Sequence, residues 1–202
     1  MWVIKIGGSL LTDTRLAEWL RVITLVRNEK VLVVPGGGIF ADHAKEAYRK
    51  SFLSEETAHE LAVLGMRQYG YILSSSSSAI KIIDNLSSFN LYSDRCPAIW
   101  LPNNKSVISL GTPESWDATS DSIAAKVAMR FKANLLLVKS HPIAFRTMRS
   151  SEAERLKIVD RFFIQKKLYK HLNVRLLDKT QARFYKYILG MRKCNIGMRI
   201  ID

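Results

Sequence analysis

Short stretches of this chain combine residue types that bind and move phosphate groups. They are KIGGS at residues 5–9, PGGG at residues 35–38 and WDATSD at residues 116–121. Glycines let backbone N–H groups approach an anion closely, and the start of a helix adds a favourable dipole. Two such anion cradles and an acid-bearing turn predict a site that holds two phosphates and moves one.

Lys5 lies near the end of a short apolar run, residues 2–6, and just before the first glycine pair, Gly7 and Gly8. Its ammonium would reach a phosphate lying over these glycines and Ser9, and would neutralise charge on a transferred group. A solvated lysine at a strand end is the alternative. The adjacent double glycine favours the phosphate contact, so we expect Lys5 to be catalytic.

The second loop contains three consecutive glycines, Gly36, Gly37 and Gly38, after an apolar run at residues 31–34. An ordinary tight turn is the alternative, but a turn needs fewer glycines. We therefore expect this loop to bind the substrate through its backbone N–H groups.

Asp121 follows Thr119 and Ser120 in the first turn of a predicted helix. Helix capping alone would explain an acid at this position. A functional acid here would instead hold two lysines in place between the phosphates. We expect Asp121 to be catalytic, with Thr119 and Ser120 contacting the substrate.

Trp116 and Asp117 precede that turn and place an aromatic ring beside a carboxylate. This combination suits a cationic or amine-bearing substrate, so Asp117 is a candidate for binding an ammonium group. A core position is the alternative for Trp116.

Strands and helices alternate along the chain. The apolar patterns predict strands at 2–6, 31–34, 98–101, 106–110, 134–139, 173–177 and 196–201, the third and fourth as a hairpin. Predicted helices lie at 14–28, 40–50, 54–73, 79–86, 120–132 and 180–189. Strands that recur after helices of this length predict an α/β fold with a mostly parallel sheet covered on both faces.

Composition limits the classes of protein that the chain can form. With 202 residues and 48% hydrophobic content it is long enough for one domain, residues 1–202. It contains no run of about 18 uncharged apolar residues, which argues against a membrane span. No signal-peptide pattern begins the chain, and Cys96 and Cys194 are isolated. We expect reduced thiols and a cytoplasmic location.

Charge is distributed unevenly. Residues 1–125 carry 12 Lys/Arg and 13 Asp/Glu, whereas residues 126–202 carry 19 and 5. A basic region of this kind suits a polyanion, either nucleic acid or a nucleotide triphosphate. A solvated basic face is the alternative. No nucleic-acid-binding motif accompanies the charge, so we expect no nucleic-acid partner.

The three stretches occur in the order found in the amino acid kinase superfamily, which the chain resembles over residues 1–140. The turn at 116–121, after Trp100–Pro102, looks most like a small branch of that family. That branch contains the aminomethylfuran phosphate kinase of methanofuran biosynthesis and its relatives in methylotrophic bacteria. The resemblance implies a three-layer αβα sandwich, ATP and Mg²⁺ as cofactors, and a carboxylate or phosphate acceptor. We also expect a homo-oligomer.

The resemblance also implies roles for single residues. Lys5 matches the family's phosphate-contacting lysine, Gly7 and Gly8 match its nucleotide-phosphate loop, and Gly36–Gly38 match its acceptor loop. Asp121 matches the aspartate that organises the catalytic lysines. The candidates for the second of these lysines, which would also contact the nucleotide, are Lys139, Lys166 and Lys167, and Lys139 matches a lysine that some members have. Residues 1–125 would then form the acceptor side and residues 126–202 the nucleotide side.

The last third departs from the family pattern. Relatives carry a Val-Asp-Gly-Val-Tyr type segment and a downstream Asp-Pro that frame the nucleoside, whereas residues 140–144 here read SHPIA. Our leading hypothesis is a kinase for a small phosphorylated or carboxylated metabolite, with an aminomethylfuran phosphate as the acceptor that the resemblance suggests. The alternatives are a degenerate kinase fold that serves as a non-catalytic binding or regulatory protein, and a nucleic-acid binder.

Overall fold

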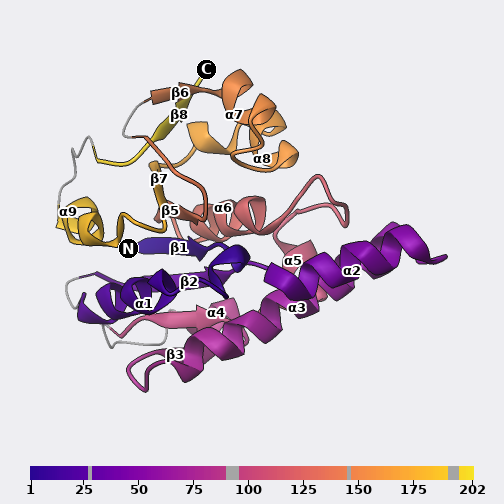
Figure 1. The fold of residues 1–202 in the computed structure, drawn as a ribbon, viewed down its shortest axis with the longest axis horizontal. Coiled ribbons are helices and arrows are strands. Elements are labelled where there is room, and N and C mark those ends of the chain that lie inside the picture. Colours follow the sequence, from indigo (N-terminus) through magenta and orange to yellow (C-terminus); the bar gives the residue numbers. More distant parts are fainter. Residues whose placement is uncertain (27–28, 90–95, 145–146, 191–195) are drawn as a thin grey trace.

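A six-stranded parallel sheet forms the centre of the fold (Figure 1). The computed structural model describes residues 1–26, 29–89, 96–144, 147–190 and 196–202. Along the sheet the strands follow the order β3-β4-β2-β1-β5-β7, and each neighbouring pair is parallel. Their bounds are β1 Trp2–Ile6, β2 Val31–Pro35, β3 Lys81–Ile83, β4 Ala98–Trp100, β5 Asn134–Lys139 and β7 Val174–Asp178.

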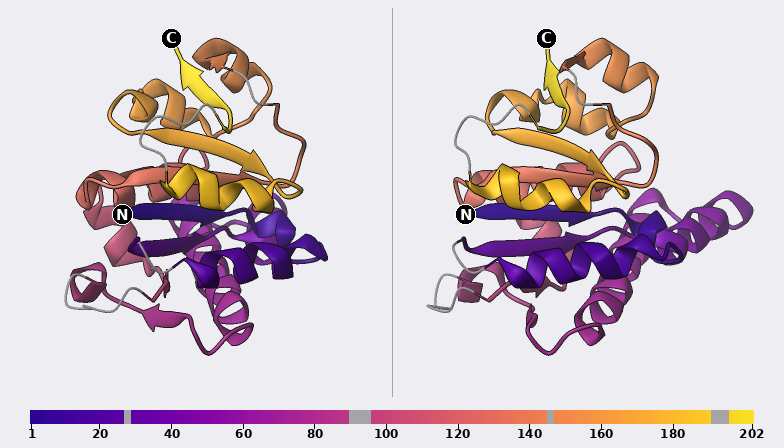
Figure 2. Two further views of the ribbon diagram at one scale, coloured as in Figure 1. Left: turned by 90° about the vertical axis from the view of Figure 1, so that its left-hand side faces the viewer. Right: turned by 60° about the vertical axis from the view of Figure 1, so that its left-hand side comes forward.

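Helices cover both faces of this sheet, which is why its central strands are apolar along nearly their whole length. On one face, α1 (Arg15–Leu25) and α9 (Tyr185–Gly190) contribute to one cluster of buried apolar side chains. On the other face, α6 (Ser120–Arg130) and α8 (Arg161–Gln165) contribute to a second cluster. Figure 2 shows α1 and α9 in front of the strands. The predicted three-layer αβα architecture is confirmed.

Two long helices form a hairpin that projects beyond the sheet (Figure 1). They are α2 (Gly38–Lys50) and α3 (Glu55–Ser75). The Ser54 hydroxyl accepts a hydrogen bond from the N–H of Thr57 and so caps α3 at its start. Helix α3 contributes side chains to both apolar clusters, and it thereby fixes the hairpin to the sheet.

A small second sheet lies beyond the β7 edge of the central sheet (Figure 1). It consists of β6 (Thr147–Arg149) and β8 (Arg199–Ile201), which are parallel. Met198, just before β8, forms an antiparallel bridge with Leu176 of β7 and so connects the two sheets. The remaining short elements are α4 Leu86–Phe89, α5 Asn104–Ser109, α7 Ser150–Arg155 and the 3-10 turns η1 Gly8–Leu10, η2 Leu168–Lys170 and η3 Ala182–Phe184.

Two predicted elements are wrong. The strand predicted at 106–110 is the helix α5, because Asn103 and Ser106 form a capping box that starts a helix there. The predicted strand–turn–strand hairpin at residues 98–110 is therefore wrong as well. The helix predicted at 79–86 contains the strand β3, whose pairing with β4 outweighs local helix propensity.

Other predictions concern element ends and residues outside the described part of the chain. Helix α1 ends at Leu25, three residues before the predicted end, and residues 27–28 are not described. Cys194 also lies outside the described residues, so its thiol state stays a prediction. No helix in the described part of the chain is both long enough and apolar enough to cross a membrane.

Candidate active site

Lys5 and Lys139 point to the same face of the sheet. Lys5 in β1 is the register partner of Leu137 in β5, and Lys139 follows Leu137 by two residues. Because side chains alternate along a strand and paired residues share a face, all three side chains point to one side. This is the side that α6 covers. Both lysines lie near the carboxyl ends of their strands, the edge at which open parallel sheets bind ligands.

Asp121, in the first turn of α6, lies between the two lysines. Its Oδ1 is 2.9 Å from Lys5 Nζ, and its Oδ2 is 2.5 Å from Lys139 Nζ. All three residues are buried, with exposed fractions of 7% for Lys5, 4% for Asp121 and 8% for Lys139. Two ammonium groups around one carboxylate leave a net positive charge at this edge, which suits a phosphate.

The charges of the three groups are coupled. Burial alone would raise the pKa of Asp121, but the charges of Lys139 and Lys5 outweigh it and lower the pKa to about 2. Burial lowers the pKa of Lys139, whereas the charge of Asp121 acts in the opposite direction. Asp121 is therefore ionised at neutral pH, and it can orient the lysines without exchanging a proton.

A second carboxylate, Asp160, caps α6 in place of Asp121. Its Oδ2 accepts hydrogen bonds from the N–H of Thr119 at 2.9 Å and the N–H of Ser122 at 3.0 Å. The side-chain hydroxyls of Thr119 and Ser122 also donate hydrogen bonds to the Asp160 carboxylate. The N–H of Phe163 in α8 donates to it as well. Because Asp160 satisfies the start of α6, the Asp121 side chain can turn towards the lysines.

The two glycine loops lie against each other beside this cluster. A Cβ atom added to Gly8 would lie 1.9 Å from the backbone nitrogen of Gly38. Gly38 itself has φ +56°, in the left-handed region that favours glycine. The N–H of Gly36 donates to the carbonyl of Ile6 at 2.8 Å, which extends the sheet bonding into the loops. The loops can approach this closely because they have no side chains.

Each glycine loop leads into a helical element, the helix α2 or the 3-10 turn η1, whose start is not capped by any described side chain. Gly37 is the N-cap of α2 and Gly7 is the N-cap of η1, and neither element has a hydrogen bond to an N-cap side chain. The first N–H groups of a helix have no partner within the helix. Here they remain available for an anion at the carboxyl edge of the sheet.

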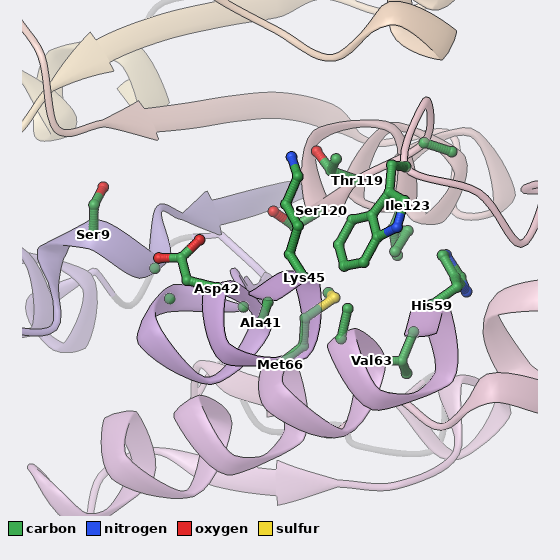
Figure 3. Close-up of a pocket in the computed structure, with 16 residues that line it drawn as sticks. Ser9, Ala41, Asp42, Lys45, His59, Val63, Met66, Thr119, Ser120 and Ile123 are labelled. Carbon is green, nitrogen blue, oxygen red and sulfur yellow. The ribbon is translucent and has the colours of Figure 1, made fainter. Parts of the chain in front are cut away.

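A pocket of about 300 Å³ opens beside the loops, between α2, α3 and the start of α6 (Figure 3). Figure 3 shows Ser9 and Asp42 at one end and His59 at the other. Apolar side chains, including Val63, Met66 and Ile123, form part of its wall. The polar and aromatic residues that line it are Ser9, Asp42, Lys45, His59, Trp116, Thr119 and Ser120.

The structure separates the predicted site residues into two groups. Gly8, Gly37 and Gly38, with Ser9, Thr119 and Ser120, line the pocket, and Lys5, Asp121 and Lys139 form the adjacent cluster. Asp117 is outside both groups: its carboxylate is 54% exposed and lies 3.8 Å from Arg161. The structure thus does not support the predicted contact between Asp117 and a substrate in this pocket.

The candidates for the second lysine are also separated. Lys139 contacts Asp121, whereas Lys166 lines a different surface hollow, with its ammonium 5.9 Å from the centre of the Phe162 ring. Lys167 precedes η2 in the left-handed conformation, φ +49°. The geometry places Lys139 alone of the three at the carboxyl edge of the sheet.

Asp160, Lys45 and His59 contribute to the site or line its pocket but were not predicted from the sequence. Asp160 has a local signal, because an aspartate before the apolar run 162–164 is typical of a helix N-cap. Its second contact, with the start of α6, spans 38 residues to Ser122 and has no local signal. Lys45 and His59 stand in helices with many polar residues, so nothing in the sequence distinguishes them.

The segment that departs from the family pattern is fixed to the end of β7. The N–H of Ile143 donates to Asp178 Oδ2 at 2.8 Å, and Gln181 Nε2 donates to the carbonyl of Ile143 at 2.7 Å. Asp178 is buried and is the register partner of Lys139. This loop therefore has a defined position next to the lysine–aspartate cluster.

A parallel sheet between two helical layers, with glycine loops and a lysine–aspartate–lysine cluster at its carboxyl edge, defines an α/β protein suited to binding phosphate groups. The family model of the amino acid kinase family matches residues 1–141. The protein belongs to this family.

Among known proteins, the chain is similar to the (5-(aminomethyl)furan-3-yl)methyl phosphate kinase of Methanocaldococcus jannaschii. The two sequences are 30% identical over 126 residues, which is 61% of this chain and 58% of the relative. The matched part thus spans less than two thirds of the relative's length.

Solved structures of kinases are similar over nearly the whole chain. The uridylate kinase of Archaeoglobus fulgidus gives a TM-score of 0.71 at 18% identity, covering 99% of each chain. An isopentenyl phosphate kinase in a substrate complex gives 0.62 at 13% identity, covering 100% of this chain and 99% of the other. The carbamate kinase of Giardia lamblia bound to AMP-PNP gives 0.58 at 12% identity, covering 100% and 98%. At these identities the similarity shows the fold alone.

Proposed function

We propose that this protein is an ATP-dependent phosphotransferase whose acceptor is a small phosphorylated or carboxylated metabolite. The observation that carries this proposal is the buried Asp121 between Lys5 and Lys139, directly beside two glycine loops in backbone contact. Phosphoryl transfer depends on positioning and on neutralising charge, and this arrangement provides both.

Each group has a role that follows from its place. Lys5 and Lys139 would stabilise negative charge on the transferred group, and Asp121 would hold the two ammonium groups apart in fixed positions. The backbone N–H groups of Gly8 and Ser9 would bind phosphate of ATP, whereas the N–H of Gly7 already donates to the carbonyl of Val138. ATP supplies the phosphoryl group, and Mg²⁺ carried by its phosphates would add positive charge.

The pocket next to the loops is the proposed acceptor site. Gly37 and Gly38 would hold the acceptor's phosphate or carboxylate, and Thr119 and Ser120 also line this pocket. Gly36, which was also predicted to bind the substrate, does not line the pocket, and its N–H already donates to the carbonyl of Ile6. A volume of about 300 Å³ suits a small ring compound. The relative with 30% identity is named for an aminomethylfuran phosphate. We propose the same class of acceptor here, and with it a place in methanofuran-type cofactor biosynthesis.

ADP formation from ATP and Mg²⁺ in the presence of single acceptors tests the proposal. The panel comprises the aminomethylfuran phosphate, uridylate, isopentenyl phosphate and carbamate, with a no-acceptor control. We expect ADP formation that depends on one small phosphate acceptor and that falls steeply in a folded Lys5→Ala variant. Turnover that survives Lys5→Ala unchanged would contradict the assignment.

A non-catalytic binding or regulatory role is the second candidate function. It is favoured by residues 140–144, which lack the acidic and glycine elements expected beside the nucleoside. Titration calorimetry with ATP separates the two functions. Binding of the acceptor phosphate without any binding of ATP would favour the non-catalytic role, whereas binding of both ligands favours the kinase.

The basic residues 126–202 are proposed to serve nucleotide phosphates or a second subunit, in a cytoplasmic homo-oligomer, rather than nucleic acid. Nucleic-acid binding through many phosphate contacts weakens steeply as salt rises. We expect DNA and RNA to be retained weakly at low salt and to be released near physiological salt. Sub-micromolar binding at that ionic strength would contradict this proposal.

A further inference from the structure

One end of the pocket contains buried polar atoms that have no partner among the described residues. His59 is 3% exposed, and its Nδ1 has no hydrogen-bond partner there. The indole Nε1 of Trp116 is likewise buried without one. Both residues line the pocket, and Figure 3 shows His59 at the end away from Ser9. An unpaired buried polar atom costs free energy, so these atoms are suited to bonding a bound molecule.

Two carboxylates lie near His59 and Trp116 without lining the pocket themselves. Glu55 Oε1 accepts a hydrogen bond from the N–H of Trp116 at 3.1 Å, and Glu114 Oε1 accepts one from Asn104 Nδ2 at 2.7 Å. Burial lowers the pKa of His59, while Asn104 and the charges of Glu114 and Glu55 act in the opposite direction. The imidazole is therefore neutral near pH 7 and offers a lone pair in a region of negative charge.

The other end of the pocket is positively charged and rich in hydrogen-bond donors. The glycine loops present backbone N–H groups there, next to the Lys5 and Lys139 ammonium groups. Lys45 projects from α2 between the two ends, with its ammonium 5.4 Å from the centre of the Trp116 ring. Lys45 is exposed, so its flexible side chain can turn towards a phosphate at the loops. Asp42, also exposed, is the carboxylate on the loop side.

We propose that the His59 end of the pocket binds a primary ammonium group of the acceptor while the glycine loops hold its phosphate. This inference rests on the proposed function, and it assigns the recognition of the amine to His59 with Glu55 and Glu114 rather than to Asp117. An ammonium has three N–H donors and no acceptor, which matches the lone pair of His59 and the negative charge that Glu55 and Glu114 contribute nearby. A ring oxygen of the acceptor would accept from the indole N–H of Trp116. The acceptor is thus a small zwitterion with opposite charges at its two ends.

Binding measured without ATP tests this assignment separately from catalysis. The probes are the aminomethylfuran phosphate and furan-3-ylmethyl phosphate, which lacks the amine. Calorimetry is performed with the wild type, His59→Phe, His59→Asn and Asp42→Asn. His59→Phe keeps a ring but removes the lone pair, and the amide oxygen of His59→Asn replaces the Nδ1 acceptor. Circular dichroism and thermal unfolding confirm that each variant is folded.

We expect the wild type to bind the amine-bearing phosphate about tenfold to a hundredfold more tightly than the analogue, as for a hydrogen bond to a charged group. His59→Phe should abolish this preference with little change for the analogue, and His59→Asn should retain part of it. Equal binding of both probes to the wild type, or a preference lost in Asp42→Asn and kept in His59→Phe, would overturn the proposal. If ATP yields no ADP with either probe, the kinase function fails, and the binding preference still decides the role of His59.

Discussion

The first 141 residues and the remaining third of the chain contribute to the site in different ways. The first part carries the groups proposed to contact phosphate: both glycine loops, Lys5, Asp121 and Lys139. The last third provides Asp160 and Asp178, whose carboxylates bind backbone N–H groups of residues 119, 122 and 143. The groups proposed to contact phosphate are therefore concentrated in short local motifs, whereas Asp160, which holds the start of α6 in place, comes from a distant part of the chain.

The largest expected effect is a difference in turnover between variants of a lysine in the first part and a lysine in the last third. Lys5→Ala should lower turnover by about 10²–10³-fold, because it removes charge stabilisation that develops in the transition state. The matched control in the last third is Lys166→Ala, whose exposed side chain lies over the Phe162 ring in a different hollow. Steady-state kinetics with saturating ATP measures the turnover of both variants. Equal losses in the two variants would remove the functional distinction between the regions.

A smaller effect is expected from the contact between the glycine loops. Gly8→Ala should destabilise the fold by about 2–3 kcal/mol, because its Cβ would overlap the backbone of Gly38 and neither loop can move without disturbing the sheet. Gly111→Ala is the control. It has φ +74°, but a Cβ there would meet nothing closer than Lys126 Nζ at 3.8 Å. Urea unfolding should show the larger loss for Gly8→Ala, and the reverse order would argue against a fixed contact between the loops.

A substitution of Asp160 tests whether the last third of the chain holds the start of α6 in place. Asp160→Ala should cost about 2 kcal/mol of stability, because it leaves N–H groups at the starts of both α6 and α8 without their acceptor. Turnover should also fall, since Thr119 and Ser120 line the pocket. Asp202→Ala removes an exposed carboxylate from the same third, paired with Lys170, and should have a smaller effect. Thermal unfolding and kinetics together decide whether Asp160 positions the site.

The smallest expected effect is the pH dependence contributed by Asp121. Its pKa of about 2 in the folded state lies below the ordinary value of 3.8, so its stabilisation is complete above pH 4 and is lost as the pH falls towards 2. The stability difference between the wild type and Asp121→Asn should shrink by on the order of 1 kcal/mol between pH 6 and pH 3. Urea unfolding at several pH values measures it. A difference that is constant over this range would show that the lysines do not hold Asp121 ionised.

The fold and the phosphate-binding motifs could be predicted because they are local properties. Glycine clusters after apolar runs mark the two loops, and alternating strands and helices predict the parallel sheet. Even the shared face of Lys5 and Lys139 follows from strand alternation once β1 and β5 are known to be neighbours. The helix α5 escaped prediction, because β-branched residues at 107 and 108 suggest a strand while the capping box at Asn103 starts a helix.

The sequence by itself thus determined the αβα architecture, the glycine loops and the position of Asp121 at a helix start. The tertiary structure decided which lysine Asp121 meets, that Asp160 caps the helix in its place, and that Asp117 points to Arg161 outside the pocket. It also brought His59 to one end of the pocket. These outcomes depend on contacts between residues far apart in the chain, and such contacts leave no periodic or local pattern from which they could be predicted.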